Sequence, residues 1–404
     1  MSTPAVVEQA SDRPTAIADV RAVTPDGVVD GATVVIEAGI VVDVVERGPR
    51  PPRTVDGRGL LLLPGLVDAH SDGLEKEIRP RRTAELPAGF AIGAFEARVR
   101  AAGVTTVFHG IGYQEREQIG RSVSLARDLD ACIRERRGQA GAGVDHRILY
   151  RFEARDPVSL SPLIDDLAAH HQDDELPLIS FEDHTPGQGQ YRDPAQFAAA
   201  VDPEAVPEGT TVDEHVAELM AEATRMERWR DRNLVRLSRL ARRGEIRLLA
   251  HDVETPDDVL AAGEAGATVA EFPLTEEAAR AARDCGMAVV MGAPNALRGG
   301  SHSGNASAQE LVARGLCDVL ASDYLPPALL AAALSMAADR LCSLPAAVGL
   351  VTSGPAAMVG LDDRGRIVAG ARADLVLVDD SGHWPTVVGL RRVGDAPARR
   401  VSGL

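Results

Sequence analysis

The segment Leu61–Asp72, with the sequence LLLPGLVDAHSD, ends an apolar run with a histidine and an aspartate two residues apart. Alternate residues of a strand point to the same face, so His70 and Asp72 are expected to project together. An imidazole nitrogen and a carboxylate oxygen at this spacing can bind one divalent metal ion. A single pair of this kind is common in proteins. The metal-site prediction is stronger here because further histidines and carboxylates follow later in the sequence.

Further histidines and carboxylates end other short apolar runs, in YRFE, SFEDHTPGQ, LLAHD and LASDYLP. The complete set predicted to bind metal is His70, Asp72, Glu153, His184, His251 and Asp323. This set offers nitrogen and oxygen donors without sulfur, which suits a hydrolytic site. We expect one or two divalent ions, with zinc favoured over manganese or iron.

Two adjacent cations need a bridging ligand, and Glu153 is the first choice for it. Glu271, in VAEFP, is the second choice, and the sequence does not decide between them. Asp323 is also predicted to be catalytic, as the group that accepts a proton from the attacking water. Zinc-like ions lower the pKa of a bound water to roughly 7, which makes this proton transfer feasible near neutral pH.

Eight short apolar segments are predicted to position these residues as strands, and helical patterns alternate with them. The segments are Gly65–His70, Val104–His109, Arg147–Glu153, Leu176–His184, Ile246–His251, Thr268–Glu271, Ala288–Met291 and Asp318–Asp323. This alternation predicts an α/β fold, a distorted (β/α)8 TIM barrel. Catalytic groups of such barrels cluster at the carboxyl ends of the strands, where the predicted ligands fall.

The two ends of the chain share a different sequence pattern, in which short Val/Ile-rich runs are separated by turn residues. It covers Ala16–Glu46 and Gly365–Asp379. Such runs predict β-hairpins, and neither end is long enough to be stable alone. We therefore expect a discontinuous β-sandwich domain from residues 1–63 and 356–404, with the barrel over residues 64–355.

The composition restricts the partners of this chain. Its 404 residues are 45% hydrophobic, and their formal net charge of −17 argues against nucleic-acid binding. No apolar run approaches the roughly 20 residues that cross a membrane. The four cysteines lack C-x-x-C spacing and suit a reducing compartment. We expect a cytoplasmic protein with a small-molecule substrate and no nucleic-acid or membrane partner, and a homodimer is possible.

Of the 43 basic residues, only Lys76 is a lysine. A bias toward GC-rich codons explains the excess of arginine, and the position four residues after Asp72 favours a function for the lysine. Together with Arg79, Arg81 and Arg82 it forms a basic segment, which an anionic ligand would require in so acidic a protein. The alternative is a solvated loop.

Several segments resemble the phosphonate-metabolism branch of the amidohydrolases, the α-D-ribose 1-methylphosphonate 5-triphosphate diphosphatase family of the carbon–phosphorus lyase pathway. They are GLVDAHSDGLEKEIRPR, SFEDHTPGQGQY, LLAHDVET, LASDYLPPALLAAA and, most unusual, MGAPNALRGGSHSGN. The resemblance, from about Leu61 onward, implies hydrolysis of a ribosyl triphosphate to the 5-phosphate and pyrophosphate. Positions matching the family, implied to bind this anionic substrate, are Lys76, Arg81, Gln188, Arg298, Ser301 and His302. Asn305 could donate a further hydrogen bond.

Two other functions stay open. The same kind of metal site serves C–N hydrolysis, as in deaminases and cyclic amidases. The basic segment and the RGGSHSGN string favour a phosphorylated substrate over an amide or nucleobase. A catalytically silent scaffold is the other alternative, and metal analysis of the purified protein would separate it from the enzymes.

Overall fold

The computed structural model describes residues 15–81, 84–116, 120–170, 175–201, 206–301 and 304–393. Two residues named above, Arg82 and His302, lie outside these described residues. The chain divides into two compact units. One comprises Met1–Phe108, Cys132–Arg147 and Ser322–Leu404, and the other comprises His109–Ala131 and Ile148–Ala321.

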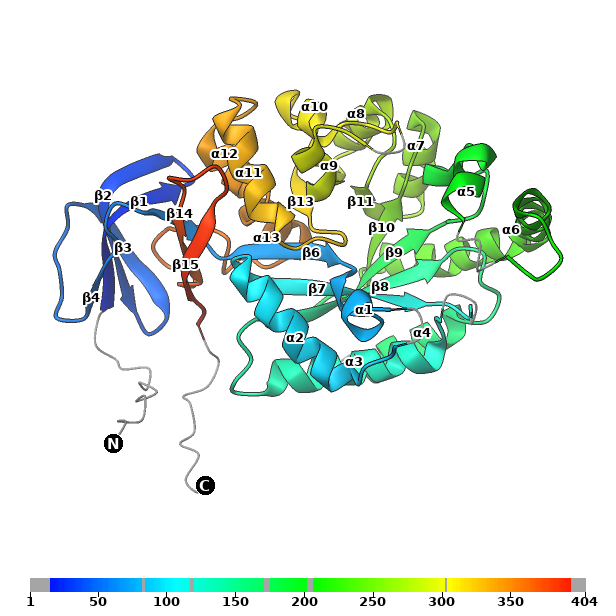
Figure 1. Cartoon of the computed structure of the whole chain (residues 1–404), viewed down its shortest axis with the longest axis horizontal. Helices are drawn as coiled ribbons and strands as arrows, with labels where there is room; N and C mark the ends of the chain where they lie inside the picture. Colours follow the sequence, from blue (N-terminus) through cyan, green and yellow to red (C-terminus); the bar gives the residue numbers. More distant parts are fainter. Residues whose placement is uncertain are drawn as a thin grey trace, which may run out of the picture. The chain divides into compact units, whose positions relative to one another are not determined.

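An eight-stranded parallel sheet, nearly closed into a barrel, confirms the predicted fold class, and its strands follow one another in chain order (Figure 1). They are β6 (Leu66–Ser71), β7 (Val104–Tyr113), β8 (Asp145–Glu153), β9 (Leu178–Glu182), β10 (Arg247–His251), β11 (Ala267–Glu271), β12 (Ala288–Gly292) and β13 (Val319–Ala321). Every predicted barrel strand has its counterpart here. Their near-continuous apolar sequences are typical of parallel strands that are buried on both faces.

The residues directly after β13 return to β6. Ser71 forms a parallel bridge with Asp323, and the Ser71 and Ser322 hydroxyl oxygens are 3.0 Å apart. The backbone N–H of Ser322 donates to Asp68 Oδ1 at 3.0 Å. Complete burial raises the pKa of Asp68 to about 6, although the hydrogen bonds from Ser322 oppose this shift. Asp68 Oδ1 therefore helps to hold the residues after β13 against β6.

A second, mainly antiparallel sheet is built from both ends of the chain. Its strands are β1 (Thr15–Thr24), β2 (Gly27–Glu37), β3 (Ile40–Glu46), β4 (Thr54–Asp56), β5 (Leu61–Pro64), β14 (Leu375–Asp379) and β15 (Thr386–Arg391). The order is β15-β14-β5-β1-β2-β3, with β4 beside β1. Val20, Val34, Leu62 and Leu375 share its buried core. Pairing of the two ends is thus confirmed, and the boundaries at 63/64 and 355/356 stay a prediction.

Helices follow most of the barrel strands. They are α1 (Gly73–Ile78), α2 (Ala88–Ala101), α3 (Val123–Gly138), α4 (Leu160–Ala169), α5 (Pro194–Ala200), α6 (Val212–Arg242), α7 (Pro256–Glu264), α8 (Glu276–Asp284), α9 (Ala293–Arg298), α10 (Ala308–Ala313), α11 (Ala328–Ala338), α12 (Leu344–Gly349) and α13 (Ser353–Val359), with a 3-10 turn, η2, at Gly189–Tyr191. None of the described helices has the length and apolarity to cross a membrane.

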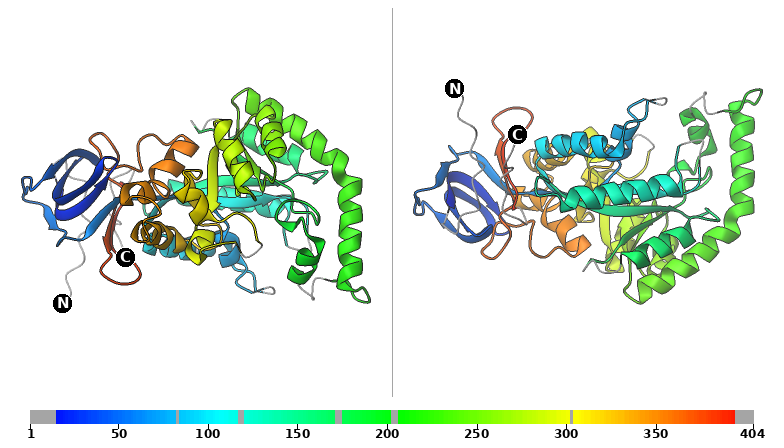
Figure 2. Two further views of the ribbon diagram at one scale, coloured as in Figure 1. Left: turned by 90° about the horizontal axis from the view of Figure 1, so that it is seen from above. Right: turned by 90° about the horizontal axis from the view of Figure 1, so that it is seen from below.

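The long helix α6 is prominent in Figure 2. It begins with a capping box, in which Thr211 Oγ1 accepts from the Glu214 N–H at 3.2 Å and Glu214 Oε2 accepts from the Thr211 N–H at 2.8 Å. Asn233, buried on this helix, donates to the carbonyls of Ala154 and Asp156 at 3.0 and 2.8 Å. These bonds fix α6 to the loop after β8.

Candidate active site

Four successive barrel strands each end on an ionisable side chain, and all four side chains belong to the same unit. The last residues of β8, β9, β10 and β11 are Glu153, Glu182, His251 and Glu271. Glu153 is in register with Glu182, and His251 is in register with Glu271. The sheet thus brings these three carboxylates and one imidazole to one level at its carboxyl edge, where barrel enzymes carry their chemistry.

His184 lies two residues beyond β9 and contacts Glu153 through both its backbone and its ring. Its N–H donates to Glu153 Oε1 at 3.0 Å, and its Nδ1 is 3.2 Å from Glu153 Oε2. Its ring centroid is 5.3 Å from that of His251. The structure therefore brings together the three residues of this unit that the sequence predicted as metal ligands.

His251 is held by carboxylates on both sides of its ring. Its Nδ1 is 2.8 Å from Glu271 Oε2, which also accepts from the Ser180 hydroxyl at 2.6 Å. Its Nε2 is 3.6 Å from Asp252 Oδ1. Burial disfavours the charged imidazole, but Asp252, followed by Glu182 and Glu271, outweighs burial and raises the pKa of His251 to about 9. This is an environment that attracts a cation.

Glu182 was not predicted from the sequence, although it lies two residues before His184. It accepts from Arg151 Nε at 2.9 and 3.1 Å, and its oxygens are 3.6 Å from His184 Nδ1 and 3.8 Å from His251 Nδ1. Burial opposes ionisation of Glu182, but the Arg151 guanidinium and then the two histidines outweigh it and lower its pKa to about 2. The carboxylate is therefore ionised at every physiological pH.

Two overlapping groups of side chains in this unit have donor atoms close enough to share a cation. One is His184, His251 and Asp252, and the other is Glu182, His251 and Glu271; the donor atoms in each lie within 4.8 Å of one another. Asp252 is the second residue that the sequence did not predict, although it directly follows His251. Because the donors are nitrogen and oxygen alone, both groups fit a zinc-like or harder divalent ion.

The backbone is strained just beyond three barrel strands. Asp252, Phe272 and Asp323 have φ angles of 56°, 53° and 55°. Left-handed conformations are tolerated by aspartate but are unusual for phenylalanine, and strain of this kind concentrates at functional sites. The ring centroids of Phe272 and His251 are 5.3 Å apart, and the two rings are nearly perpendicular, at 84°.

The other unit carries the remaining predicted ligands. His70 is the penultimate residue of β6, whereas Asp72 lies one residue beyond the strand, as the N-cap of α1. His70 Nε2 and Asp72 Oδ1 are nevertheless 3.3 Å apart. The Asp72 N–H donates to the Asp323 carbonyl at 2.6 Å, and the Asp323 N–H donates to the His70 carbonyl at 3.0 Å. The structure therefore brings His70, Asp72 and Asp323 together within this unit.

The residues predicted to bind substrate lie in both units. Lys76 is exposed, and its ammonium lies 4.4 Å from the centroid of the Tyr324 ring, next to Asp323. Arg81 is exposed, whereas Arg79 donates to Glu85 Oε2 at 3.2 and 2.9 Å. In the other unit Gln188 and Arg298 are exposed, and Ser301 and Asn305 are half-buried.

We expect Glu271→Gln to weaken metal binding and to lower kcat by about 10- to 100-fold, as is usual for a partner that orients a ligating histidine. The amide is a poorer acceptor for His251 Nδ1 and leaves less negative charge beside the ring. Metal titration and steady-state kinetics would measure both effects. Ser180→Ala, which removes only the hydroxyl donor to Glu271, serves as the milder control. Wild-type metal affinity in Glu271→Gln would contradict this role.

The barrel, with histidines and carboxylates at the ends of its strands, defines a hydrolase of the amidohydrolase type. A protein-family model described as "Amidohydrolase family" matches residues 245–383 of this chain. The chain is 36% identical over 363 residues to the alpha-D-ribose 1-methylphosphonate 5-triphosphate diphosphatase of Escherichia coli K12, covering 89% of this chain and 94% of that protein. The chain therefore belongs to the amidohydrolase family, in the branch of this diphosphatase, and it is a metal-dependent hydrolase.

Solved structures share the fold at lower identity. A prolidase complexed with N-methylphosphonate-L-proline has a TM-score of 0.60 at 16% identity, covering 96% of this chain and all (100%) of that one. An adenosine deaminase from Xanthomonas campestris with bound zinc has a TM-score of 0.55 at 18% identity, covering 95% and 92%. At such identities the likeness establishes the fold alone.

Proposed function

We propose that this enzyme hydrolyses α-D-ribose 1-methylphosphonate 5-triphosphate to the 5-phosphate and pyrophosphate, in phosphonate catabolism. The observation that carries the proposal is the 36% identity to the diphosphatase over nearly the whole length of both chains. The residues at the strand ends support the proposal. Carboxylates and a histidine end β8 to β11, and the cationic side chains of Lys76, Arg81 and Arg298 follow β6 and β12. A cytoplasmic location and a homodimer belong to the same proposal.

The residues that would hold the metal are His70, Asp72, Glu153, His184, His251 and Asp323. His70, Glu153 and His251 lie at the last or penultimate position of a barrel strand, and Asp72, His184 and Asp323 lie one or two residues beyond a strand. The carboxyl ends of such strands are the usual place for a metal centre. Glu153 stays the first choice for the bridging ligand and Glu271 the second, and each carboxylate contacts one of the proposed ligating histidines, His184 and His251. Zinc is the proposed metal, in one or two ions, and manganese or iron would suit the same donors.

When bound, a divalent metal ion lowers the pKa of water and withdraws charge from phosphoryl oxygens. Asp323 would accept the proton of the water that attacks phosphorus, and this attack breaks the P–O–P bridge between the α- and β-phosphoryl groups and releases pyrophosphate. Lys76, Arg81 and Arg298 offset the charge that develops on the phosphoryl oxygens and on the departing pyrophosphate. Gln188, Ser301 and Asn305 donate hydrogen bonds to the substrate, and His302 is assigned the same role from the sequence resemblance.

Phosphorus-31 NMR of the ribosyl triphosphate with the metal-loaded enzyme tests this function. Pyrophosphate and the 5-phosphate are the expected products. Release of orthophosphate, or no turnover with either zinc or manganese, would contradict the proposal. Hydrolysis of amides or nucleobases in a parallel panel would favour the C–N hydrolase, whose relatives share this fold.

Replacement of the single lysine separates a functional role from its chance survival. Lys76→Arg keeps the positive charge but exchanges a compact ammonium for a planar guanidinium, so we expect kcat/KM to fall by about 10-fold with little change in thermal stability. Steady-state kinetics and thermal unfolding of the same preparation would measure both. Arg79→Lys, on a side chain already bound to Glu85, is the matched control. Unchanged kinetics in Lys76→Arg would mean that the lysine has no specific role in turnover and survives at this position by chance.

A further inference from the structure

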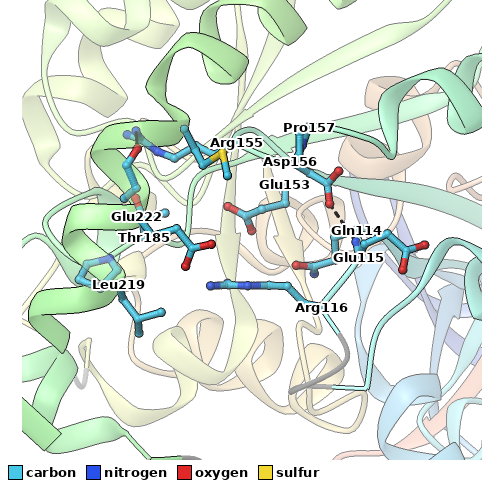
Figure 3. Close-up of a pocket in the computed structure, with 13 residues that line it drawn as sticks. Gln114, Glu115, Arg116, Glu153, Arg155, Asp156, Pro157, Thr185, Leu219 and Glu222 are labelled. Carbon is cyan, nitrogen blue, oxygen red and sulfur yellow. Dashed lines mark hydrogen bonds between the residues drawn. The ribbon is translucent and has the colours of Figure 1, made fainter. Parts of the chain in front are cut away.

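A cavity beside Glu153 lies wholly within one unit (Figure 3). Its walls are the segments that follow β7, β8 and β9, together with one side of α6. The cavity has a volume of about 110 Å³, and its mouth is open to solvent. It adjoins Glu153, one of the predicted metal ligands.

Most charged groups around the cavity are already engaged in the fold. Asp156 accepts from the backbone N–H groups of Glu115, Val158 and Ser159, each at 2.8 Å. Arg155 donates to Asp183 at 3.1 Å and to the Ala223 carbonyl at 2.8 Å. These residues shape the cavity walls and are not available to a ligand.

Gln114 is different. Its side chain is buried, at 3% exposure, and its Oε1 atom accepts no hydrogen bond from any described residue. A buried carbonyl oxygen left without a donor is costly, and most such groups in proteins are satisfied. Gln114 is one of the residues that line the cavity, so a small movement of its side chain would let a ligand hydroxyl group supply the absent donor.

Arg116 is another residue of the cavity wall whose side chain has no partner among the described residues. Its backbone is fixed by hydrogen bonds with Arg121, at 3.0 and 3.1 Å. In Figure 3 its guanidinium reaches across the cavity below Glu153, and within the described part of the chain it forms no ion pair. A guanidinium group on a fixed backbone can donate two parallel hydrogen bonds to a pair of anionic oxygens, such as those of a phosphonate.

We propose that this cavity is the subsite for the ribosyl phosphonate end of the substrate. Arg116 binds the phosphonate oxygens, and Gln114 accepts a hydrogen bond from a ribose hydroxyl. The inference rests on the proposed function and adds the residues that select the substituent at the first carbon of the sugar. The triphosphate end of the substrate would be bound by Lys76, Arg81 and Arg298, as proposed above.

Binding to the metal-loaded enzyme tests the subsite without turnover. Isothermal titration calorimetry would compare α-D-ribose 1-methylphosphonate 5-phosphate with D-ribose 5-phosphate, which lacks the phosphonate. Arg116→Met is expected to weaken binding of the first compound by about 100-fold and to leave the second unchanged. Gln114→Leu should weaken both by about 5- to 10-fold, since both carry the ribose hydroxyls. Arg225→Met, on an exposed arginine of α6 outside the cavity, is the control and should change neither.

The outcomes separate the subsite from the reaction. Equal losses for both compounds in Arg116→Met, or no loss for either, would overturn the subsite. Failure of the wild-type enzyme to bind the phosphonate compound more tightly than ribose 5-phosphate would also overturn it. If the wild type shows this preference but releases no pyrophosphate from the triphosphate, the proposed function fails and the subsite stands.

Discussion

Asp323→Asn is expected to lower kcat by about 10³-fold with a smaller change in KM, because an amide cannot accept the proton of the attacking water. Asparagine tolerates the left-handed backbone, so the φ angle of 55° at this position is retained. The hydrogen bond from the Asp323 N–H to the His70 carbonyl is a backbone contact and survives the substitution. The loss therefore reports on the carboxylate itself and not on barrel closure.

Asp318→Asn is the matched control, because Asp318 directly precedes β13 and is bound to Arg283 and to the Val289 N–H. We expect it to keep wild-type kcat and to lose at most a little stability, as is usual for a partly exposed ion pair. Metal content of both variants, measured on the samples used for kinetics, separates loss of the proton acceptor from loss of a ligand. A kcat for Asp323→Asn close to that of the wild type would remove Asp323 from the mechanism.

The barrel could be predicted because its strands are short apolar runs bounded by polar residues, as in β10, where LLAHD ends the run. Strand ends were placed within a few residues, and the ligand types that follow them were therefore found as well. The terminal sheet was predicted from the same kind of pattern. The hairpin predicted over Gly365–Asp379 is wrong before β14, because residues 365–374 form turns and a bridge instead of a strand, although Ile367 is part of the sheet's core.

The side chains that the sequence could not predict are those whose role depends on distant partners. Glu182 faces Arg151, 31 residues earlier, as well as the two histidines. Arg79 resembles its basic neighbours in the sequence, but its guanidinium is bound by Glu85. Gln114 and Arg116 become candidates only when α6, about a hundred residues later, closes the cavity over them. Such pairings follow from packing and leave no local pattern.

His251→Asn is expected to reduce the bound metal and to lower kcat by at least about 10³-fold, since a metal supplies several kcal/mol of transition-state stabilisation. The imidazole lies among Glu182, Asp252 and Glu271, so its removal takes away the nitrogen donor that both candidate groups share and leaves these carboxylates facing one another. Elemental analysis and kinetics on one preparation would measure the two losses.

A thermal readout makes this prediction independent of activity. Adding zinc to chelator-treated wild-type protein should raise its Tm, because a ligand that binds only the folded state stabilises it. We expect a much smaller shift for His251→Asn. His170→Asn, on an exposed histidine that follows α4, should retain the full shift. Equal shifts in the wild type and in His251→Asn would mean that this histidine does not bind the metal, and the carboxyl ends of β9 to β11 would then lose their place in the proposed site.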